Sequence, residues 1–264
     1  MKLLHEILND QTSGASALYK KTLYLLQSES KYRSPDKALK VIYKIKTQFP
    51  EMAVFEYLFQ SLNRVNKEDL TSRLRLLMLE CSTELEFIND NLKRLWRKKR
   101  RVITFSNSSI VEHILCKSQN KVESVLLSQA SPRNEGIILG KKLNKAGLKV
   151  EICTDAALAN LIRKSDYVFL GADCVTRKYF VNKTGTYPLL LAAKAKGAKS
   201  FILCEKFKFV PSYKFAPRPQ KTSEIAKALS EKLKVQNYYF EKIPLFLVDY
   251  LVSRSGMKKI TGRQ

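Results

Sequence analysis

The sequence is short of the residues that metal and disulfide chemistry require. Only two of its 264 residues are histidine, and its five cysteines include no pair at CxxC spacing. A structural zinc site takes four Cys or His ligands, so none is expected here. The cysteine number is odd and three of the five lie in or beside apolar stretches, which predicts free thiols in a reducing compartment.

Long apolar runs are also absent. No run approaches the roughly 20 residues of a membrane span. The first ten residues, MKLLHEILND, are too short and too interrupted by charge for a signal peptide. Hydrophobic residues still make up 45% of the chain, enough for a core. We therefore expect a cytoplasmic protein of one large or two small domains, with no membrane association.

Acidic residues are scarce. The chain has 24 Asp and Glu against 48 Lys and Arg, a formal net charge of +24. Such a field attracts anionic partners, such as phosphorylated small molecules, nucleic acid or an acidic protein. A lysine-rich proteome would give the same excess, since most of the lysines are scattered. The exception is a basic run at 94–101, and both explanations stay open.

Glycine and proline are rare in the first 99 residues. Apolar residues recur there at spacings of three and four, which predicts helices near 14–29, 35–46, 52–62 and 70–95. Pro35 stands at the start of the second helix, where a missing N–H costs little. Residues 1–99 are therefore expected to form a small all-helical domain.

The pattern changes at residue 100. Short apolar runs at 102–106, 122–128, 148–153, 167–171 and 200–204 alternate with helical stretches near 108–117, 134–146, 155–164 and 187–197. Strands joined by crossover helices predict an α/β fold, a Rossmann-like parallel sheet covered on both faces, over residues 100–264. Two more helices are expected near 222–234 and 244–254.

Polar residues follow these strands at the carboxyl edge, where ligands bind in such sheets. The first strand leads into Ser106, Asn107, Ser108 and Ser109, which can cap the next helix or donate to an anion. Arg133 follows the second strand, either as a phosphate clamp or as a solvated surface residue. The third strand is followed by an ordinary cap, Asp155.

The fourth strand leads into Gly171, Ala172 and Asp173. The Asp173 carboxylate can move a proton beside a carbonyl, or it can cap a turn. Asn182, Lys183 and Gly185 then precede a helix and form a candidate oxyanion or phosphate cradle, although they fall short of a Walker A pattern.

Together these segments resemble one family. The order TFSNSS (104–109), SPRNEG (131–136), GAD (171–173) and NKTGT (182–186) is similar to the family that joins the alpha, beta and delta regulatory subunits of translation initiation factor 2B with 5-methylthioribose-1-phosphate isomerase and ribose-1,5-bisphosphate isomerase. The segments SGAS (13–16), CEKFKF (204–209) and FEKIP (240–244) extend the resemblance over about residues 11–256.

The resemblance implies a sugar-phosphate pocket between the two domains. In the isomerases, an Asp that matches Asp173 and a Cys that matches Ser106 carry the aldose-to-ketose conversion. A thiol has a pKa near ~8.5, whereas an alcohol is a far poorer acid. Asn107, Arg133, Asn182 and Lys183 match ligand-contacting positions. Ser13 stands where the isomerases have an arginine, which removes one phosphate donor.

These departures favour a regulatory binding protein of the initiation factor 2B type over an enzyme. It would hold a sugar phosphate or a nucleotide monophosphate, without a cofactor. Two alternatives stay open: a sugar-phosphate isomerase that works through Asp173, and a basic RNA- or ribosome-associated protein. The resemblance also implies a homodimer formed by the α/β domains, with a possible translation-factor partner. The apolar segment 245–252, expected as a helix, either contributes to that interface or packs in the core.

Overall fold

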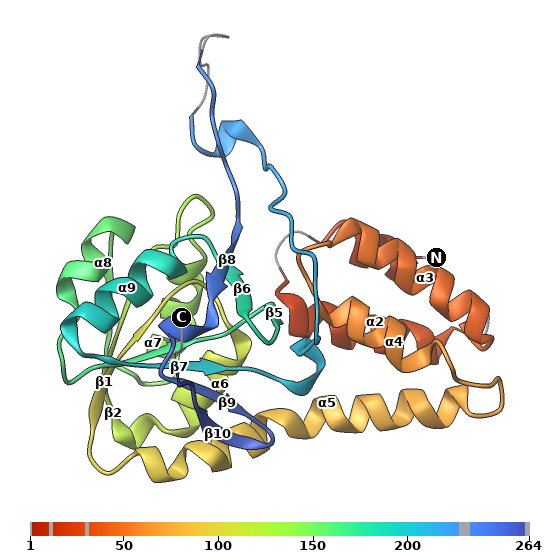
Figure 1. The fold of residues 1–264 in the computed structure, drawn as a ribbon, viewed down its shortest axis with the longest axis horizontal. Coiled ribbons are helices and arrows are strands. Elements are labelled where there is room, and N and C mark those ends of the chain that lie inside the picture. Colours follow the sequence, from red (N-terminus) through yellow and green to blue (C-terminus); the bar gives the residue numbers. More distant parts are fainter. Residues whose placement is uncertain (1, 11–12, 30–31, 227–232, 262–264) are drawn as a thin grey trace.

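The N-terminal region is helical, as the spacing of apolar residues predicts. The computed structural model describes residues 2–10, 13–29, 32–226 and 233–261, and Figure 1 shows its layers. The helices are α1 (Lys2–Leu8), α2 (Ala15–Ser28), α3 (Pro35–Gln48), α4 (Val54–Leu62) and α5 (Leu70–Leu92). All four expected helices are present, and α1 is an additional one.

Helix α5 belongs to two hydrophobic cores. Its first half places Leu74 and Cys81 in the core of the helical region, whereas Ile88 and Leu92 pack in the core beneath the main sheet. None of the helices in the described part of the chain has the length and apolar character that a membrane crossing requires. Because α5 packs into the cores of both regions, the division of the chain into two domains at residues 99 and 100 stays a prediction.

A seven-stranded sheet forms the centre of the second half, in the order β10-β9-β7-β4-β1-β2-β3. All neighbouring strands are parallel except the antiparallel pair β9 and β10. The strands are β1 (Arg100–Thr104), β2 (Val122–Ser128), β3 (Val150–Cys153), β4 (Tyr167–Leu170), β7 (Lys199–Leu203), β9 (Tyr250–Ser253) and β10 (Gly256–Lys259). The predicted α/β fold with a mainly parallel sheet is confirmed.

Helices cover both faces of this sheet. Neighbouring residues of one strand alternate between the two cores: Val168 packs with α8 (Asp155–Leu161) and α9 (Thr186–Lys196), whereas Phe169 packs with α6 (Ser109–Lys117) and α7 (Glu135–Lys145). Successive side chains of a strand point to opposite faces, so a sheet covered on both sides requires continuous apolar strands. The run 167–170 meets this requirement.

A second, three-stranded antiparallel sheet lies beside the carboxyl edge. It comprises β5 (Cys174–Val175), β6 (Tyr179–Lys183) and β8 (Phe240–Pro244), in the order β5-β6-β8. The sequence pattern did not predict this sheet. Its consequence for the site is that Asn182 and Lys183 come from the end of a strand, where pairing fixes their positions.

The expected helix at 244–254 is wrong. After a short 3₁₀ turn at Leu245–Leu247, the chain forms β9, which pairs in parallel with β7. Tyr250 stacks on Phe201 across this pair, with ring centroids 5.0 Å apart. The aromatic and β-branched side chains of β9 fit the pleated surface of a sheet, and β9 pairs with the side of β7 that β4 leaves free.

The expected helix at 222–234 is only partly described. Thr222–Glu224 form a 3₁₀ turn, residues 233–234 carry no helix, and residues 227–232 lie outside the described residues. The two ends of this segment meet through a bridge between Pro219 and Tyr238. The segment between Pro219 and Tyr238 is called here the arm. Figure 1 shows it projecting from the molecule between the helical region and the sheet.

Candidate functional site

A cavity of about 440 Å³ lies between the helical region and the carboxyl edge of the main sheet. Its wall comes from the loops after α1, α3, β1, β2 and β4, from the end of β6, and from the arm. Ligand pockets commonly enclose roughly 300–1,000 Å³. Eight of the nine predicted site residues line this cavity: Ser106, Asn107, Ser108, Ser109, Arg133, Asp173, Asn182 and Lys183. Their role as ligand contacts stays a prediction.

The loop after β1 presents hydroxyl and amide groups. Ser106 adopts a left-handed backbone conformation with φ 65°, which is uncommon for a residue other than glycine. The Asn107 Oδ1 atom is buried and accepts no hydrogen bond from any described residue. A Cβ at Gly171 would lie 2.4 Å from Ser108 Oγ, so only glycine lets this loop pack there. The result is a group of uncommitted polar atoms that face a ligand-sized space.

Hydrogen bonds to the Asp155 side chain fix the loop after β2. The carboxylate accepts hydrogen bonds from the backbone N–H of Ala130 at 2.9 Å and of Ser131 at 2.8 Å. Partial burial would raise its pKa, but hydrogen bonds from this loop outweigh burial and lower it. The residue that the sequence suggests as an ordinary helix cap is therefore a tether for the loop that carries Arg133.

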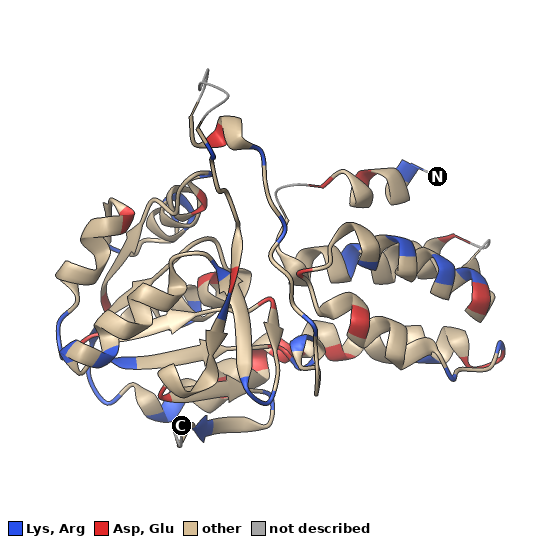
Figure 2. Cartoon of the chain, turned by 45° about the horizontal axis from the view of Figure 1, so that its top comes forward, with Lys and Arg blue, Asp and Glu red and all other residues tan. Residues whose placement is uncertain are grey.

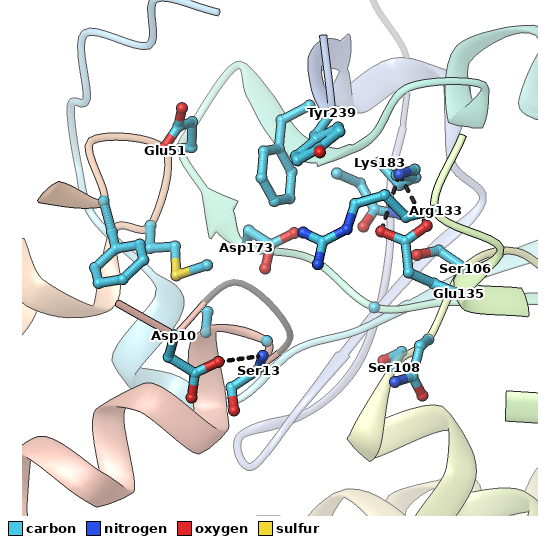
Figure 3. Close-up of a pocket in the computed structure, with 18 of the residues that line it drawn as sticks. Asp10, Ser13, Glu51, Ser106, Ser108, Arg133, Glu135, Asp173, Lys183 and Tyr239 are labelled. Carbon is cyan, nitrogen blue, oxygen red and sulfur yellow. Dashed lines mark hydrogen bonds and ion pairs between the residues drawn. The ribbon is translucent and has the colours of Figure 1, made fainter. Parts of the chain in front are cut away.

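Arg133 is a cation without a carboxylate partner. Its guanidinium lies 5.3 Å from the centre of the Tyr239 ring, and it forms no ion pair with any residue the structure describes. Figure 3 shows the side chain reaching into the cavity. A guanidinium in this position can donate two parallel hydrogen bonds to a phosphate.

Lys183, in contrast, forms an ion pair with a carboxylate of the same cavity wall, that of Glu135. Its ammonium lies 3.0 Å and 2.9 Å from the two carboxylate oxygens of Glu135, and 4.8 Å from the centre of the Tyr239 ring (Figure 3). The neighbouring Asn182 donates its amide hydrogen to Thr186 at 3.1 Å. An anion that approached Lys183 would have to compete with Glu135.

Gly185 is the predicted residue that the structure does not bring to the cavity. Its N–H and that of Tyr187 donate to Glu241 Oε1 at 2.9 Å and 2.7 Å, so a carboxylate already occupies the start of α9. Gly185 has φ 106°, and a Cβ there would lie 2.7 Å from the Phe105 ring. Glycine is needed at this position for backbone conformation and for packing.

Asp173 places an ionisable side chain in the cavity wall. Its carboxylate forms no hydrogen bond or ion pair with any described residue, while its backbone bonds to Val181 and Ala53. Burial raises its pKa to about 6; the Lys208 ammonium opposes this shift, and Glu205 and Glu51 add to it. A carboxyl group with this pKa exists in both protonation states near neutral pH and can donate or accept a proton.

Lys208 and Glu205 form a buried ion pair that the sequence reasoning missed. Lys208 Nζ lies 3.0 Å from Glu205 Oε2, and the two side chains are 6% and 2% exposed. Ser16 in the helical region donates to Glu205 Oε1 at 2.6 Å. Burial lowers the Lys208 pKa, but Glu205 and Asp173 outweigh it and the pKa is raised. Lys208 therefore lines the cavity as an ammonium ion. The only signal in the sequence was a lysine four residues after a cysteine that ends a strand.

The arginine expected to be missing near the N-terminus is partly replaced. Ser13 lines the cavity, and the Lys21 ammonium lies 3.2 Å from its hydroxyl and 2.5 Å from Asp10. Asp10 also accepts a hydrogen bond from the Ser13 N–H at 2.8 Å (Figure 3). A positive charge is thus present behind Ser13, but Lys21 is not part of the cavity wall that the structure describes.

The cavity wall contains neither a thiol nor a metal-binding cluster among the described residues. Cys174 and Cys204 are buried elsewhere, and burial raises the pKa of both thiols, that of Cys174 to about 12. Besides its paired charges, the wall offers the guanidiniums of Arg133 and Arg218, an amide oxygen, several hydroxyls, and the carboxyl groups of Asp173 and Glu51, whose pKa values burial raises.

Comparison with known proteins assigns the family. The initiation factor 2 subunit family profile matches residues 12–259. The chain belongs to this family. An eIF-2B subunit 2-like translation initiation factor from Pyrococcus horikoshii is 26% identical over 268 residues, which cover 97% of this chain and 95% of the relative. A ribose 1,5-bisphosphate isomerase from Archaeoglobus fulgidus is 29% identical over 59% of this chain and 52% of its own length.

Solved structures agree with this assignment. The crystal structure of translation initiation factor eIF-2B from Pyrococcus horikoshii superposes with a TM-score of 0.82 at 25% identity, over 97% of this chain and 95% of that one. A chain of the tetrameric eIF2B-beta2-delta2 complex from C. thermophilum superposes with a TM-score of 0.72 at 19% identity, over 98% and 89%. The second likeness concerns the fold alone.

Proposed function

We propose that this protein binds a sugar phosphate or a nucleotide monophosphate in the cavity and acts as a regulatory protein of the initiation factor 2B type, without catalysis. The observation that carries the proposal is the state of Ser106. The resemblance implies that Ser106 stands where the isomerases have a cysteine, and among the described residues its hydroxyl has no hydrogen bond to a histidine or a carboxylate. An alcohol without an adjacent base is a poor acid and a poor nucleophile.

Arg133 supports the phosphate part of the proposal. Its guanidinium has no ion pair with a described residue, which is also true of Arg218 in the same wall, and it lies 5.3 Å from the centre of the Tyr239 ring. Asn107 Oδ1 and the Ser106 and Ser108 hydroxyls would then receive the sugar. This arrangement fits one phosphate on a small polyhydroxylated body.

An isomerase is the second candidate, and Asp173 is the observation that favours it. A pKa of about 6 suits a group that must both take and return a proton. In this alternative Asp173 would act as the base, and Ser106 would be a weak acid at best.

The assembly and the domain division belong to the same proposal. Residues 1–99 would form the helical domain and residues 100–264 the α/β domain. Two copies would pair through their α/β domains in the cytoplasm, with a translation-factor partner possible. The C. thermophilum relative comes from a tetrameric complex, which supports association of this kind. Any contribution of segment 245–252 would be made by a 3₁₀ turn and strand β9.

Phosphorus NMR tests the proposal directly. The protein is incubated separately with 5-methylthioribose 1-phosphate, ribose 1,5-bisphosphate and AMP, and signals are followed for hours. We expect line broadening by at least one ligand and no new ketose signal. Arg133→Ala should weaken binding by roughly 10- to 150-fold, the value of a charge-assisted hydrogen bond. Arg97→Ala, an exposed arginine away from the cavity, is the matched control.

Two outcomes would contradict the proposal. A ketose product that disappears in Asp173→Asn would establish the isomerase. Absence of both binding and conversion would remove the small-molecule function from this cavity.

A further inference from the structure

A row of lysines follows the edge of the main sheet opposite the cavity. At this edge, called here the amino edge, β1, β2, β3, β4, β7 and β9 begin and β10 ends. Exposed lysines stand at or within three residues of six of these seven strand ends: Lys98, Lys99, Lys121, Lys149, Lys164, Lys199, Lys258 and Lys259. The parallel topology therefore gathers lysines that are scattered through the sequence.

Carboxylates do not neutralise this row. Of the eight lysines, Lys199 alone has an ion pair with a described residue, and its ammonium lies 3.9 Å from Asp249. Asp166, at the same edge, is buried and engaged by Arg101 in two hydrogen bonds of 3.1 Å and 2.7 Å. Glu123 and Glu151 are the exposed acids nearby, at the second positions of β2 and β3. The edge thus keeps a large excess of positive charge.

The cavity does not account for the net charge of the chain. Its described wall holds five acidic residues and five basic ones: Asp10, Glu51, Glu135, Asp173 and Glu224 against Arg133, Lys183, Lys208, Arg218 and Lys221. Figure 2 shows Lys and Arg on the loops at the end of the sheet farthest from the helical region, with acidic residues grouped near the junction of the two regions. The excess of positive charge therefore lies outside the cavity, and the amino edge holds part of it.

We infer that the amino edge binds RNA through its phosphate backbone. Seven strands spaced about 4.8 Å apart spread the lysines over roughly 29 Å, a length that suits an extended polyanion. Protein–protein interfaces are depleted in lysine, whereas lysine is a common phosphate ligand in nucleic-acid complexes. Ammonium groups contact phosphates rather than base edges, so the binding is independent of sequence.

Fluorescence anisotropy with a labelled 20-nucleotide oligouridylate tests this inference. Eight phosphate contacts predict a slope of about −5 to −6 for log affinity against log salt, a loss of about 10³-fold between 50 and 200 mM KCl. The edge variant is Lys98→Glu, Lys99→Glu and Lys121→Glu. Its slope should fall to about −3 to −4, and its affinity at 50 mM should fall at least 30-fold.

The control variant carries the same change of charge elsewhere. Lys37→Glu, Lys40→Glu and Lys44→Glu lie on exposed positions of α3 in the helical region, and we expect affinity within threefold of the wild type. Equal losses in both variants, or no RNA binding by the wild type, would overturn the inference. Equal competition by polyglutamate at matched charge would also overturn it and indicate an acidic protein. If the edge variant does not fold, the three Lys→Gln changes replace it.

Discussion

Removal of the Lys208 ammonium should destabilise the protein strongly, because it leaves a buried carboxylate with no counter-ion. Glu205 is 2% exposed, and its other hydrogen-bond donor is the neutral hydroxyl of Ser16 at 2.6 Å. Breaking a buried ion pair from one side costs about 3–5 kcal/mol. Lys208→Met keeps most of the stem volume, so we expect a loss of unfolding free energy in that range at pH 7.

Companion variants separate the charge effect from packing. The double variant Lys208→Met/Glu205→Gln has no buried charge at the pair and should unfold within about 1 kcal/mol of the wild type. Glu205→Gln alone should cost less than Lys208→Met, because Asp173 still faces the ammonium. The deficit of Lys208→Met should also shrink towards pH 5. Burial disfavours the charged form of an acid that lacks a counter-ion, so a lower pH favours the neutral form and removes the cost of the buried charge.

Urea denaturation at pH 7 and pH 5, followed by circular dichroism, measures all four proteins. A loss below 1 kcal/mol in Lys208→Met would refute the reasoning, since the carboxylate would then be solvated. A double variant as unstable as the single one would refute it as well and point to lost packing.

Three further changes probe the cavity wall. Asp173→Asn should stabilise the fold by about 1–3 kcal/mol at pH 7 and by little near pH 3.5 in thermal unfolding. The raised pKa means that the wild type loses stability as the pH rises from 3.8 to about 6, and that the loss is complete above this range. Asp155→Ala should cost about 2–4 kcal/mol in urea denaturation at pH 7, through two lost bonds to a carboxylate, and should weaken phosphate binding because the Arg133 loop is released. Ser106→Cys should allow detectable ketose formation by phosphorus NMR if Asp173 is correctly placed, and Ser106→Ala should not; equal inactivity of both would show that the wall lacks more than a thiol.

The main sheet could be predicted from local pattern, and the small sheet could not. The continuous apolar runs at 122–128 and 167–170 are typical of strands that are buried on both faces of a sheet. The cavity lies at the carboxyl ends of these strands. In contrast, β9 depends on the free edge of β7, and β8 depends on β6, 57 positions earlier at the Phe240–Lys183 pair. Pairing between strands so far apart in the sequence cannot be recognised from the spacing of apolar residues within one short segment.

The same distinction holds for the site residues. Arg133 and Asp173 could be predicted because they lie in the loops that follow β2 and β4 at the carboxyl edge. Gly185 lies outside the described cavity wall, and its N–H donates to Glu241, a partner that is 56 positions away in the sequence. Lys208 was overlooked because Glu205 and Asp173 meet it only in the fold. Residue type and spacing therefore locate a binding edge, but long-range pairing decides which groups there remain free.

This pairing also limits what the cavity can hold. Lys183 and Lys208 each have a carboxylate within 3.0 Å, so an incoming phosphate gains little from either unless it displaces Glu135 or Glu205. Arg133 has no such competitor and can receive one phosphate at full strength. Arg218 is another wall guanidinium without an ion pair among the described residues, and it donates to the Gln48 carbonyl at 2.9 Å. The pairing therefore leaves the guanidiniums of Arg133 and Arg218, rather than Lys183 and Lys208, as the groups best able to receive a ligand phosphate.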